Sequence, residues 1–240
     1  MIALAAFLIG GLVKGTIGLG LPTVSLAILS ATMDLRAAIE LMAVPAAMTN
    51  IYQCVQGGAF WELLRRHWSL FVAAAIGVVI GTMILFSVDP NLLCGVLGII
   101  LCFYAVLGMV TVPITIPRRW EKVLGPLTGI STGIVTGATG SLALPLMIYI
   151  DGLHFDKERF VQFTGMVATA ITVPLMIGVT GRQMFTGGVL PTAIAAVVPS
   201  FLGLWVGQRL RRRVPQALFR KLVLLALLAI GVKLIDKGFF

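Results

Sequence analysis

Two short segments of the chain combine closely spaced glycines, hydroxyl side chains and a proline. The first reads Lys14-Gly-Thr-Ile-Gly-Leu-Gly-Leu-Pro22, and the second reads Thr136-Gly-Ala-Thr-Gly-Ser-Leu-Ala-Leu-Pro145. Glycine frees the backbone and proline removes a hydrogen-bond donor, so each segment should interrupt a helix. Proline then suits the first turn of a new helix. Free amides at the start of that helix, with a lysine nearby, are groups that bind an anion.

The polar groups on and near these segments are candidate ligands for such an anion. Lys14 is the most informative, because a cation within apolar sequence is by default a functional-site hypothesis. Its alternative role is snorkelling or a structural contact. The hydroxyl groups could instead bond their own helix backbone, and the two amides could join helices. The candidate binding residues are Lys14, Gly15, Thr16, Gly18, Gly20, Asn50, Gln53, Thr136, Gly137, Thr139, Gly140, Ser141, Thr169 and Thr172.

The sequence has no set of residues that suits catalysis or metal binding. Cys54, Cys94 and Cys102 lie in apolar sequence without a CxxC or Cys/His spacing, and His67 and His154 lie beside loops. No HExxH motif, paired carboxylate or His/Asp/Ser set lies in the apolar segments. We therefore expect no catalytic residue, no metal and no cofactor, and we expect that the protein is not an enzyme.

The composition indicates that these residues are held by membrane helices. Hydrophobic residues make up 59% of the 240 residues and charged residues 11%, whereas a soluble domain usually has about 25% charged residues. The mean hydropathy is +1.05. Apolar runs of about 18 residues or more predict membrane-spanning helices. Eight apolar segments can be marked, at roughly 2–32, 37–58, 68–88, 91–113, 123–153, 160–180, 186–208 and 216–236.

The two halves of the chain resemble each other when one is shifted by 122 residues. The same ordered series of glycines, a proline, an aspartate, a GxxxG pair and a second proline occurs in both halves, with slightly larger shifts toward the end. We therefore predict one membrane domain over residues 1–240, with internal repeats at 1–113 and 123–240. The aligned pairs include Gly11 and Gly133, Gly15 and Gly137, Gly18 and Gly140, Asp34 and Asp156, Glu40 and Gln162, Gly77 and Gly203, and Gly81 and Gly207.

The basic residues lie between apolar runs, so the net charge of +9 reflects membrane topology and gives no sign of nucleic-acid binding. If all eight segments cross once, the two sides hold eight and nine basic residues. If segments 2–32 and 123–153 are re-entrant hairpins, the sides hold 13 and four, as the positive-inside rule requires. The larger group is Arg65, Arg66, Arg118, Arg119, Lys122, Lys157, Arg159, Arg209, Arg211, Arg212, Arg213, Arg220 and Lys221, and the smaller is Arg36, Arg182, Lys233 and Lys237.

We therefore predict an all-α integral membrane protein with two inverted repeats. Each repeat would be a re-entrant broken-helix hairpin followed by three transmembrane helices, and both termini would lie outside the cytoplasm. Inverted repeats with broken helices at matching positions indicate a transporter site near the bilayer midplane. The expected partners are a small anion and the lipid bilayer of the cell inner membrane. The alternatives are an anion channel with the same hairpins, a membrane enzyme, and a structural or sensory role.

The scarcity of acidic residues within the apolar segments bears on the energy source. Glu40 and Asp151 lie near segment ends, and no acidic pair lies at mid-depth to relay protons. Moving one charge through 100 mV is worth about 2.3 kcal/mol, so an inside-negative potential could drive anion export alone. We expect an electrogenic uniporter, and the main alternative is proton-coupled export through Glu40.

Several of these motifs together resemble a known family. The duplicated glycine-rich hairpin that ends in proline, the link with Asp34, and Val44-Pro45 followed by Thr49-Asn50 are similar to the sulfite exporter TauE/SafE family, which includes membrane transporters like the 4-toluene sulfonate uptake permease. The resemblance covers nearly the whole chain. It implies a secondary transporter that exports a small sulfur-containing anion, such as sulfite, sulfoacetate or a related organosulfonate. A homodimer is left open.

Overall fold

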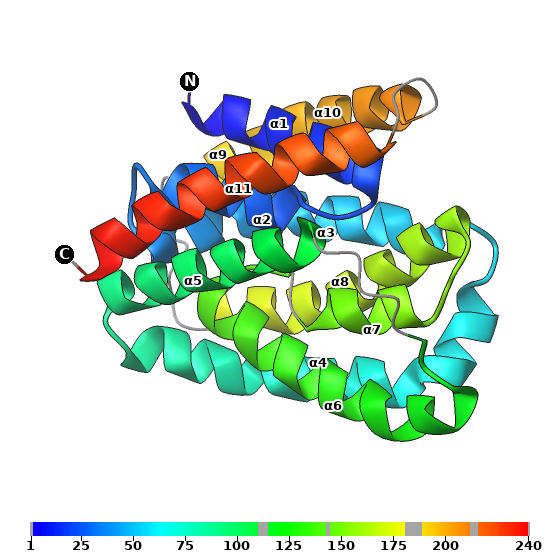
Figure 1. The fold of residues 1–240 in the computed structure, drawn as a ribbon. Helices are drawn as coiled ribbons and strands as arrows, with labels where there is room; N and C mark the ends of the chain where they lie inside the picture. The colour runs from blue at the N-terminus through cyan, green and yellow to red at the C-terminus, as the bar shows by residue number, and fades with distance from the viewer. Residues whose placement is uncertain (1, 110–114, 143–144, 181–188, 212–215, 240) are drawn as a thin grey trace.

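The computed structural model describes residues 2–109, 115–142, 145–180, 189–211 and 216–239, and every regular element in these ranges is a helix (Figure 1). Four helices in these ranges are long and apolar enough to cross a membrane by length and composition: Phe60–Ser87, Pro90–Met109, Lys157–Ile177 and Val189–Leu210. The helices are α1 (Ile2–Ile17), α2 (Leu21–Ser30), α3 (Leu35–Val55), α4 (Phe60–Ser87), α5 (Pro90–Met109), α6 (Arg118–Thr139), α7 (Leu146–Gly152), α8 (Lys157–Thr180), α9 (Val189–Ala195), α10 (Val197–Leu210) and α11 (Gln216–Phe239).

Both glycine-rich segments interrupt a helix, as predicted. Helix α1 ends before Gly18, and α2 begins after Gly20; the φ angles of these glycines are 94° and 115°. Helix α6 ends before Gly140, whose φ is 72°, and α7 begins directly after Pro145. A positive φ is readily adopted by glycine, so these residues suit the points where the helical path of the backbone is interrupted.

The aligned aspartates have the same structural role in both halves, because each accepts a hydrogen bond from the first turn of a helix. Asp34 is the N-cap of α3, and its carboxylate accepts a hydrogen bond from Arg36 N at 2.9 Å. Asp156 directly precedes α8 and accepts one from Arg159 N at 2.8 Å. Each carboxylate satisfies an amide that the first turn of its helix leaves free.

Glycines bring the first helix of each half against the third long helix of the other half. A Cβ atom at Gly15 or Gly207 would overlap the backbone of the opposite helix in the α1–α10 pair, and one at Gly137 or Gly81 would do so in the α6–α4 pair. When the two halves are aligned, each overlap in the α1–α10 pair has a counterpart in the α6–α4 pair. They involve Gly11 with Ser200 and Gly133 with Ala74, Gly15 with Leu204 and Gly137 with Val78, Gly203 with Leu8 and Gly77 with Ile130, and Gly207 with Leu12 and Gly81 with Ile134.

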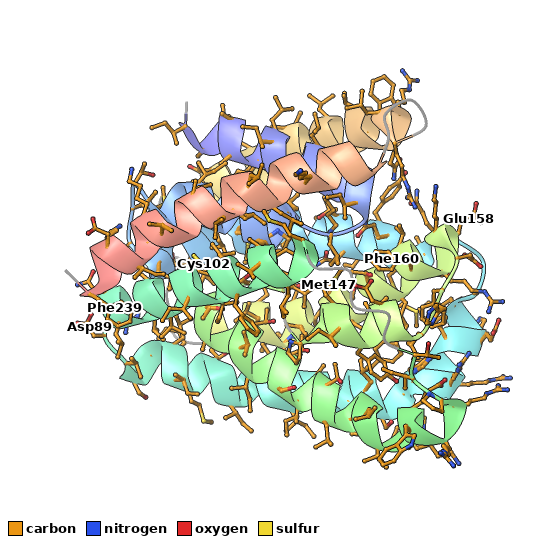
Figure 2. The ribbon with its side chains drawn as sticks, in the orientation of Figure 1. Asp89, Cys102, Met147, Glu158, Phe160 and Phe239 are labelled. Atoms are coloured by element: carbon orange, nitrogen blue, oxygen red, sulfur yellow. The ribbon has the colours of Figure 1, made fainter. Side chains whose placement is uncertain are left out.

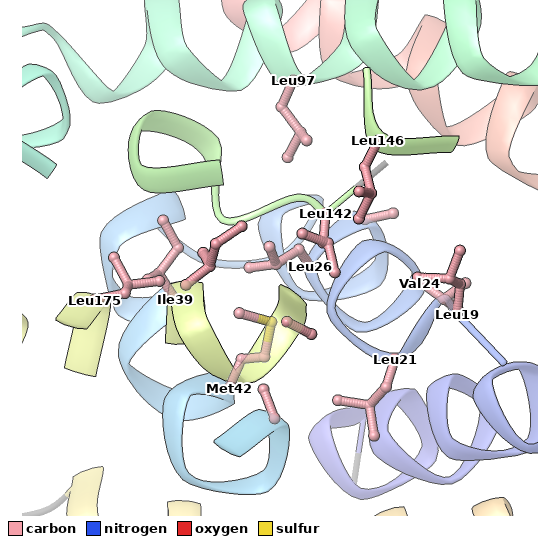
Figure 3. Close-up of a cluster of buried hydrophobic side chains, with 14 of the residues drawn as sticks. Leu19, Leu21, Val24, Leu26, Ile39, Met42, Leu97, Leu142, Leu146 and Leu175 are labelled. Atoms are coloured by element: carbon pink, nitrogen blue, oxygen red, sulfur yellow. The ribbon is translucent and has the colours of Figure 1, made fainter. Parts of the chain in front are cut away.

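The hydrophobic core surrounds the two helix breaks. Helices α3 and α8 pack against each other, as do α5 and α11. Figure 3 shows buried side chains from α2, α3, α5, α7 and α8 around Leu142, which follows the second break. This packing buries Leu19, Leu21 and Leu142, which lie in or beside the two breaks.

Charged contacts mark two opposite ends of the helix bundle. Near the start of α4, Glu62 pairs with Arg159 at 3.1 Å. Near its end, Leu85 O accepts from Arg36 Nε, also at 3.1 Å. Helix α4 bends at His67, where the backbone leaves helical φ and ψ angles, and the two contacts lie on either side of this kink. Figure 2 shows Asp89 at one end of the molecule and Glu158 at the other. Arg182, Arg212 and Arg213 of the charge count lie outside the described residues.

The glycine contacts predict that larger side chains at Gly15 or Gly137 will disrupt folding. Gly15→Leu and Gly137→Leu should each force two helices apart and lower both the yield of folded protein and its melting temperature in detergent. Size-exclusion chromatography and a thermal unfolding assay measure these effects. Ala5→Leu, at an exposed position of α1, is the matched control and should behave like the wild type. Normal stability of both glycine variants would contradict the packing assigned here.

Candidate functional site

Lys14 lies in the last turn of α1, and its side chain is only 2% exposed. Its ammonium donates to Thr49 Oγ1 at 3.0 Å and to Asn50 Oδ1. Both acceptors belong to α3, so the lysine reaches across from the first hairpin to the helix that follows it. Lys14 is therefore a buried cation directed at neighbouring polar groups.

The charge of this ammonium is not neutralised by a carboxylate in the part of the chain that the structure describes. The ion pairs there join Arg66 to Glu121, and Arg159 to Glu62 and Asp156. A lysine ammonium has three N–H donors, and two of those on Lys14 have protein acceptors. Burying a charge is costly unless it is paired. The arrangement therefore suits an anion that would accept from the third donor.

Asn50 connects the lysine to the second half of the chain. Its Nδ2 donates to Thr172 Oγ1 at 2.9 Å, and that hydroxyl donates to Ala168 O at 2.6 Å. Asn50 and Thr172 are equivalent positions when the halves are aligned, since 50 and 172 differ by 122. This hydrogen bond therefore joins the two halves at matching points on α3 and α8.

Gln53 lies one turn further along α3 and is 1% exposed. Its Nε2 donates to Gly18 O, in the break of the first hairpin, at 3.2 Å. Its Oε1 is buried and has no hydrogen-bond partner among the described residues. A buried polar atom of this kind requires an explanation, because nearly all such atoms in native proteins are paired.

A small cavity joins these groups. It is lined by Lys14, Gly18, Leu19, Gly20, Pro22, Asn50, Gln53, Leu142, Thr164 and Ala168. Its volume of about 10 Å³ leaves room for about one water molecule. Gly20 is the N-cap of α2, and no side chain caps that helix. The positive end of α2 therefore adds to the field of Lys14 at this cavity.

A second cavity occupies the matching place in the other half and has a different lining. Thr136 stands where the first cavity has Lys14, and Leu175 where it has Gln53; Met42 likewise matches Thr164. The second cavity is also about 10 Å³. Pro22, Asn50 and Leu142 line both cavities and so lie between them. One cavity is cationic and polar, and its counterpart is mainly apolar.

A wide vestibule of about 780 Å³ leads from one end of the molecule to Gln53. Gln53 lines both the vestibule and the Lys14 cavity, and it forms the boundary between them. Arg211 Nη2 donates to Lys157 O at 3.2 Å across the wall of the vestibule. The vestibule is lined by Gly15, Gln53, Gln56, Gly57, Lys157, Glu158, Val161, Gln208 and Arg211. Two cationic side chains, Lys157 and Arg211, line it beside one acidic side chain, Glu158, so its net positive charge favours the entry of an anion.

The structure brings only part of the predicted set together. Lys14, Gly18, Gly20, Asn50 and Gln53 line the first cavity, and Thr136, Gly140 and Thr172 line the second. Gly15 and Gly137 contact the backbones of α10 and α4, so packing alone requires glycine there.

The predicted hydroxyl groups have hydrogen-bond partners within the protein, and the contact of Ser141 joins the two halves. Thr16, Thr139 and Thr169 donate to carbonyls of their own helices. Thr136 donates to Ser141 O, and the Ser141 hydroxyl reaches Thr23 Oγ1 at 3.4 Å.

Sequence reasoning missed Thr49 and Thr164, and it missed most of the vestibule. Thr49 adjoins Asn50 in the sequence, and Thr164 lies on the helix that packs against the helix of Asn50. Both could have been found from their proximity to Asn50, which the sequence analysis had already selected. The part of the chain that the structure describes contains no group of three or more His, Cys, Asp or Glu side chains that could hold a metal ion.

The long apolar helices indicate a multi-pass membrane protein, in which the side chain of Lys14 is buried close to the break between α1 and α2. The sequence model of the family Sulfite exporter TauE/SafE matches residues 2–234 of the 240. The chain therefore belongs to the TauE/SafE family, which is a family of transporters. No curated protein and no solved structure matches the chain.

The contacts of Lys14 predict that its charge is required for anion binding. Lys14→Ala should weaken the binding of sulfite to the purified protein by about tenfold or more, because a charged hydrogen bond is lost. Thermal shift and calorimetric titration in detergent measure the effect. Lys233→Ala removes an exposed lysine and is the matched control. Unchanged affinity in a well-folded Lys14→Ala protein would assign Lys14 to structure alone.

Proposed function

We propose that this protein is a secondary transporter that exports a small sulfur-containing anion, such as sulfite, sulfoacetate or a related organosulfonate. The observation that carries the proposal is the buried Lys14 ammonium, which has one N–H donor without a partner in the described part of the chain, beside the uncapped start of α2. The TauE/SafE family, to which the chain belongs, supplies the chemical class of the substrate. Compact sulfur oxyanions match this cluster of donors in charge.

The two halves would be inverted repeats, with α1–α2 and α6–α7 as re-entrant hairpins. The Glu62–Arg159 ion pair supports this topology. If every segment crossed the membrane once, these two residues would lie on opposite sides. With re-entrant hairpins they share the cytoplasmic side, and Arg36 lies on the other. The exchanged glycine contacts between the halves support the repeats at 1–113 and 123–240.

A carrier accounts for the cavities better than the alternative of an anion channel with the same hairpins. The vestibule is wide, but each of the two inner cavities has room for only about one water molecule. An open channel would need a continuous path for a larger anion. A carrier instead opens its site to one side at a time, and the vestibule would be the cytoplasmic access to it.

The topology can be tested with single cysteines at two exposed positions. Asp89→Cys and Glu158→Cys should react with an impermeant reagent from opposite sides of the membrane, Asp89→Cys from outside and Glu158→Cys only after the cells are opened. The termini Met1 and Phe240 lie outside the described residues, so these two internal positions are preferable. If both cysteines react from the same side, the re-entrant arrangement is wrong.

The role of Gln162, the counterpart of Glu40, supports transport without a coupled proton. Gln162 accepts from Ala59 N at 2.9 Å and donates to Cys54 O at 3.1 Å, so it secures the turn between α3 and α4. In the second half, the neutral side chain of Gln162 has a structural role. This supports a structural role for Glu40 in the first half as well. Transport would then be electrogenic and would need no coupled proton.

Sulfite flux in proteoliposomes tests both the function and its energy source. An inside-negative potential set with potassium and valinomycin should accelerate sulfite efflux at equal pH, and the flux should saturate with concentration. Glu40→Gln should keep this flux, and Lys14→Ala vesicles report the leak. A flux driven by a pH gradient at zero potential, insensitive to an imposed potential and lost in Glu40→Gln, would establish proton coupling instead. A flux without saturation would favour the channel.

A further inference from the structure

We propose that the anion bound at Lys14 carries a single negative charge and a hydroxyl group of its own, and that this hydroxyl donates to Gln53 Oε1. The inference rests on the proposed function and narrows its substrate class. Two kinds of molecule have this chemistry: hydrogensulfite, when its proton is on oxygen, and a hydroxyalkanesulfonate. Both combine an oxyanion for the ammonium with an O–H donor for the amide oxygen.

The orientation of the Gln53 amide follows from its surroundings. Its Nε2 donates to Gly18 O at 3.2 Å. The reverse orientation would set the amide oxygen against this carbonyl oxygen, with two acceptors facing each other. Helix α8 also restrains the residue, because Gly165 allows that helix to lie directly against Gln53 and Cys54. Oε1 is therefore held in place as an acceptor.

The groups near Gln53 Oε1 are hydrogen-bond donors. Some of them already have acceptors, and others still need one. The Lys14 ammonium has one N–H donor without a partner among the described residues, and the first-turn amides of α2 have no side-chain cap. A ligand whose surface oxygens are all acceptors would satisfy these donors and leave Gln53 Oε1 facing lone pairs. A ligand with a hydroxyl group satisfies the donors and the acceptor together.

The number of charges supports the same ligand. Lys14 is the cationic side chain that lines the cavity, and none of the other described residues of its lining is charged. One ammonium balances one negative charge. A doubly charged oxyanion would keep an unbalanced charge in a buried site, which is unfavourable.

The second half of the chain indicates that the fold does not require this glutamine. The equivalent position is Leu175, which is buried in the second cavity. A leucine thus fits at the matching place on the packed α3–α8 pair. Gln53→Leu is therefore a suitable variant, since it removes the acceptor and copies a side chain that the other half already holds. Gln208→Leu makes the same change in the vestibule wall, away from the Lys14 cavity.

The test compares ethanesulfonate with isethionate, its hydroxylated analogue, by calorimetric titration of the full-length protein in detergent. The wild type should bind isethionate about tenfold more tightly, because one buried hydrogen bond distinguishes the two. Gln53→Leu should abolish this preference, and Gln208→Leu should keep it. Equal binding of the two ligands by the wild type, or a preference that survives in Gln53→Leu, would overturn the inference.

Sulfite, titrated at a mildly acidic pH where hydrogensulfite predominates, separates the two ligand sources. Tighter binding of sulfite than of isethionate, with a loss in Gln53→Leu, identifies hydrogensulfite; the reverse order identifies a hydroxyalkanesulfonate. Ethanesulfonate binding that depends on Lys14 but gains nothing from the hydroxyl would leave the proposed function intact and refute only this inference. If none of the three ligands binds, both fail.

Discussion

The buried ammonium of Lys14 is the interaction on which the rest of the arrangement depends. A lysine in the interior of a membrane protein is costly, and here its hydrogen bonds to Thr49 and Asn50 satisfy two N–H groups without neutralising the charge. The surrounding structure has to keep lipid away from this charge. That enclosure is formed by the breaks in both hairpins, the packing of α3 on α8 and the apolar core around Leu142.

The close contacts between glycines explain how short, broken helices can be stable in such a place. Helices α2 and α7 have only ten and seven residues, too short to cross a bilayer. Each hairpin is instead supported by a long helix of the opposite half, backbone against backbone. Neither half supplies this support to itself, so the two halves depend on each other for folding.

Much of the fold could be predicted from the sequence, because proline, glycine and aspartate have strong local effects. The breaks at Gly18 and Gly140 and the paired helix starts after Asp34 and Asp156 follow from such effects. Lys14 stood out because a charge is rare in apolar sequence. The hydroxyl groups were less predictable: Thr16 and Thr169 bond their own helices, whereas Thr49 accepts from Lys14. Which partner a threonine has depends on the neighbouring helix, and the sequence does not contain that information locally.

The difference between the two inner cavities has a kinetic consequence for the proposed carrier. In the proposed carrier, an anion in the Lys14 cavity would be stabilised by the ammonium and the start of α2, whereas the counterpart lined by Met42 and Leu175 would offer it no cationic side chain among its described residues. The free energy of the anion on the proposed path therefore differs between the two cavities. A passive carrier must still equilibrate its substrate equally in both directions, so unequal affinities at its two faces require compensating differences in turnover. Such a protein would show a low half-saturation concentration and slow release at one face, with the opposite behaviour at the other.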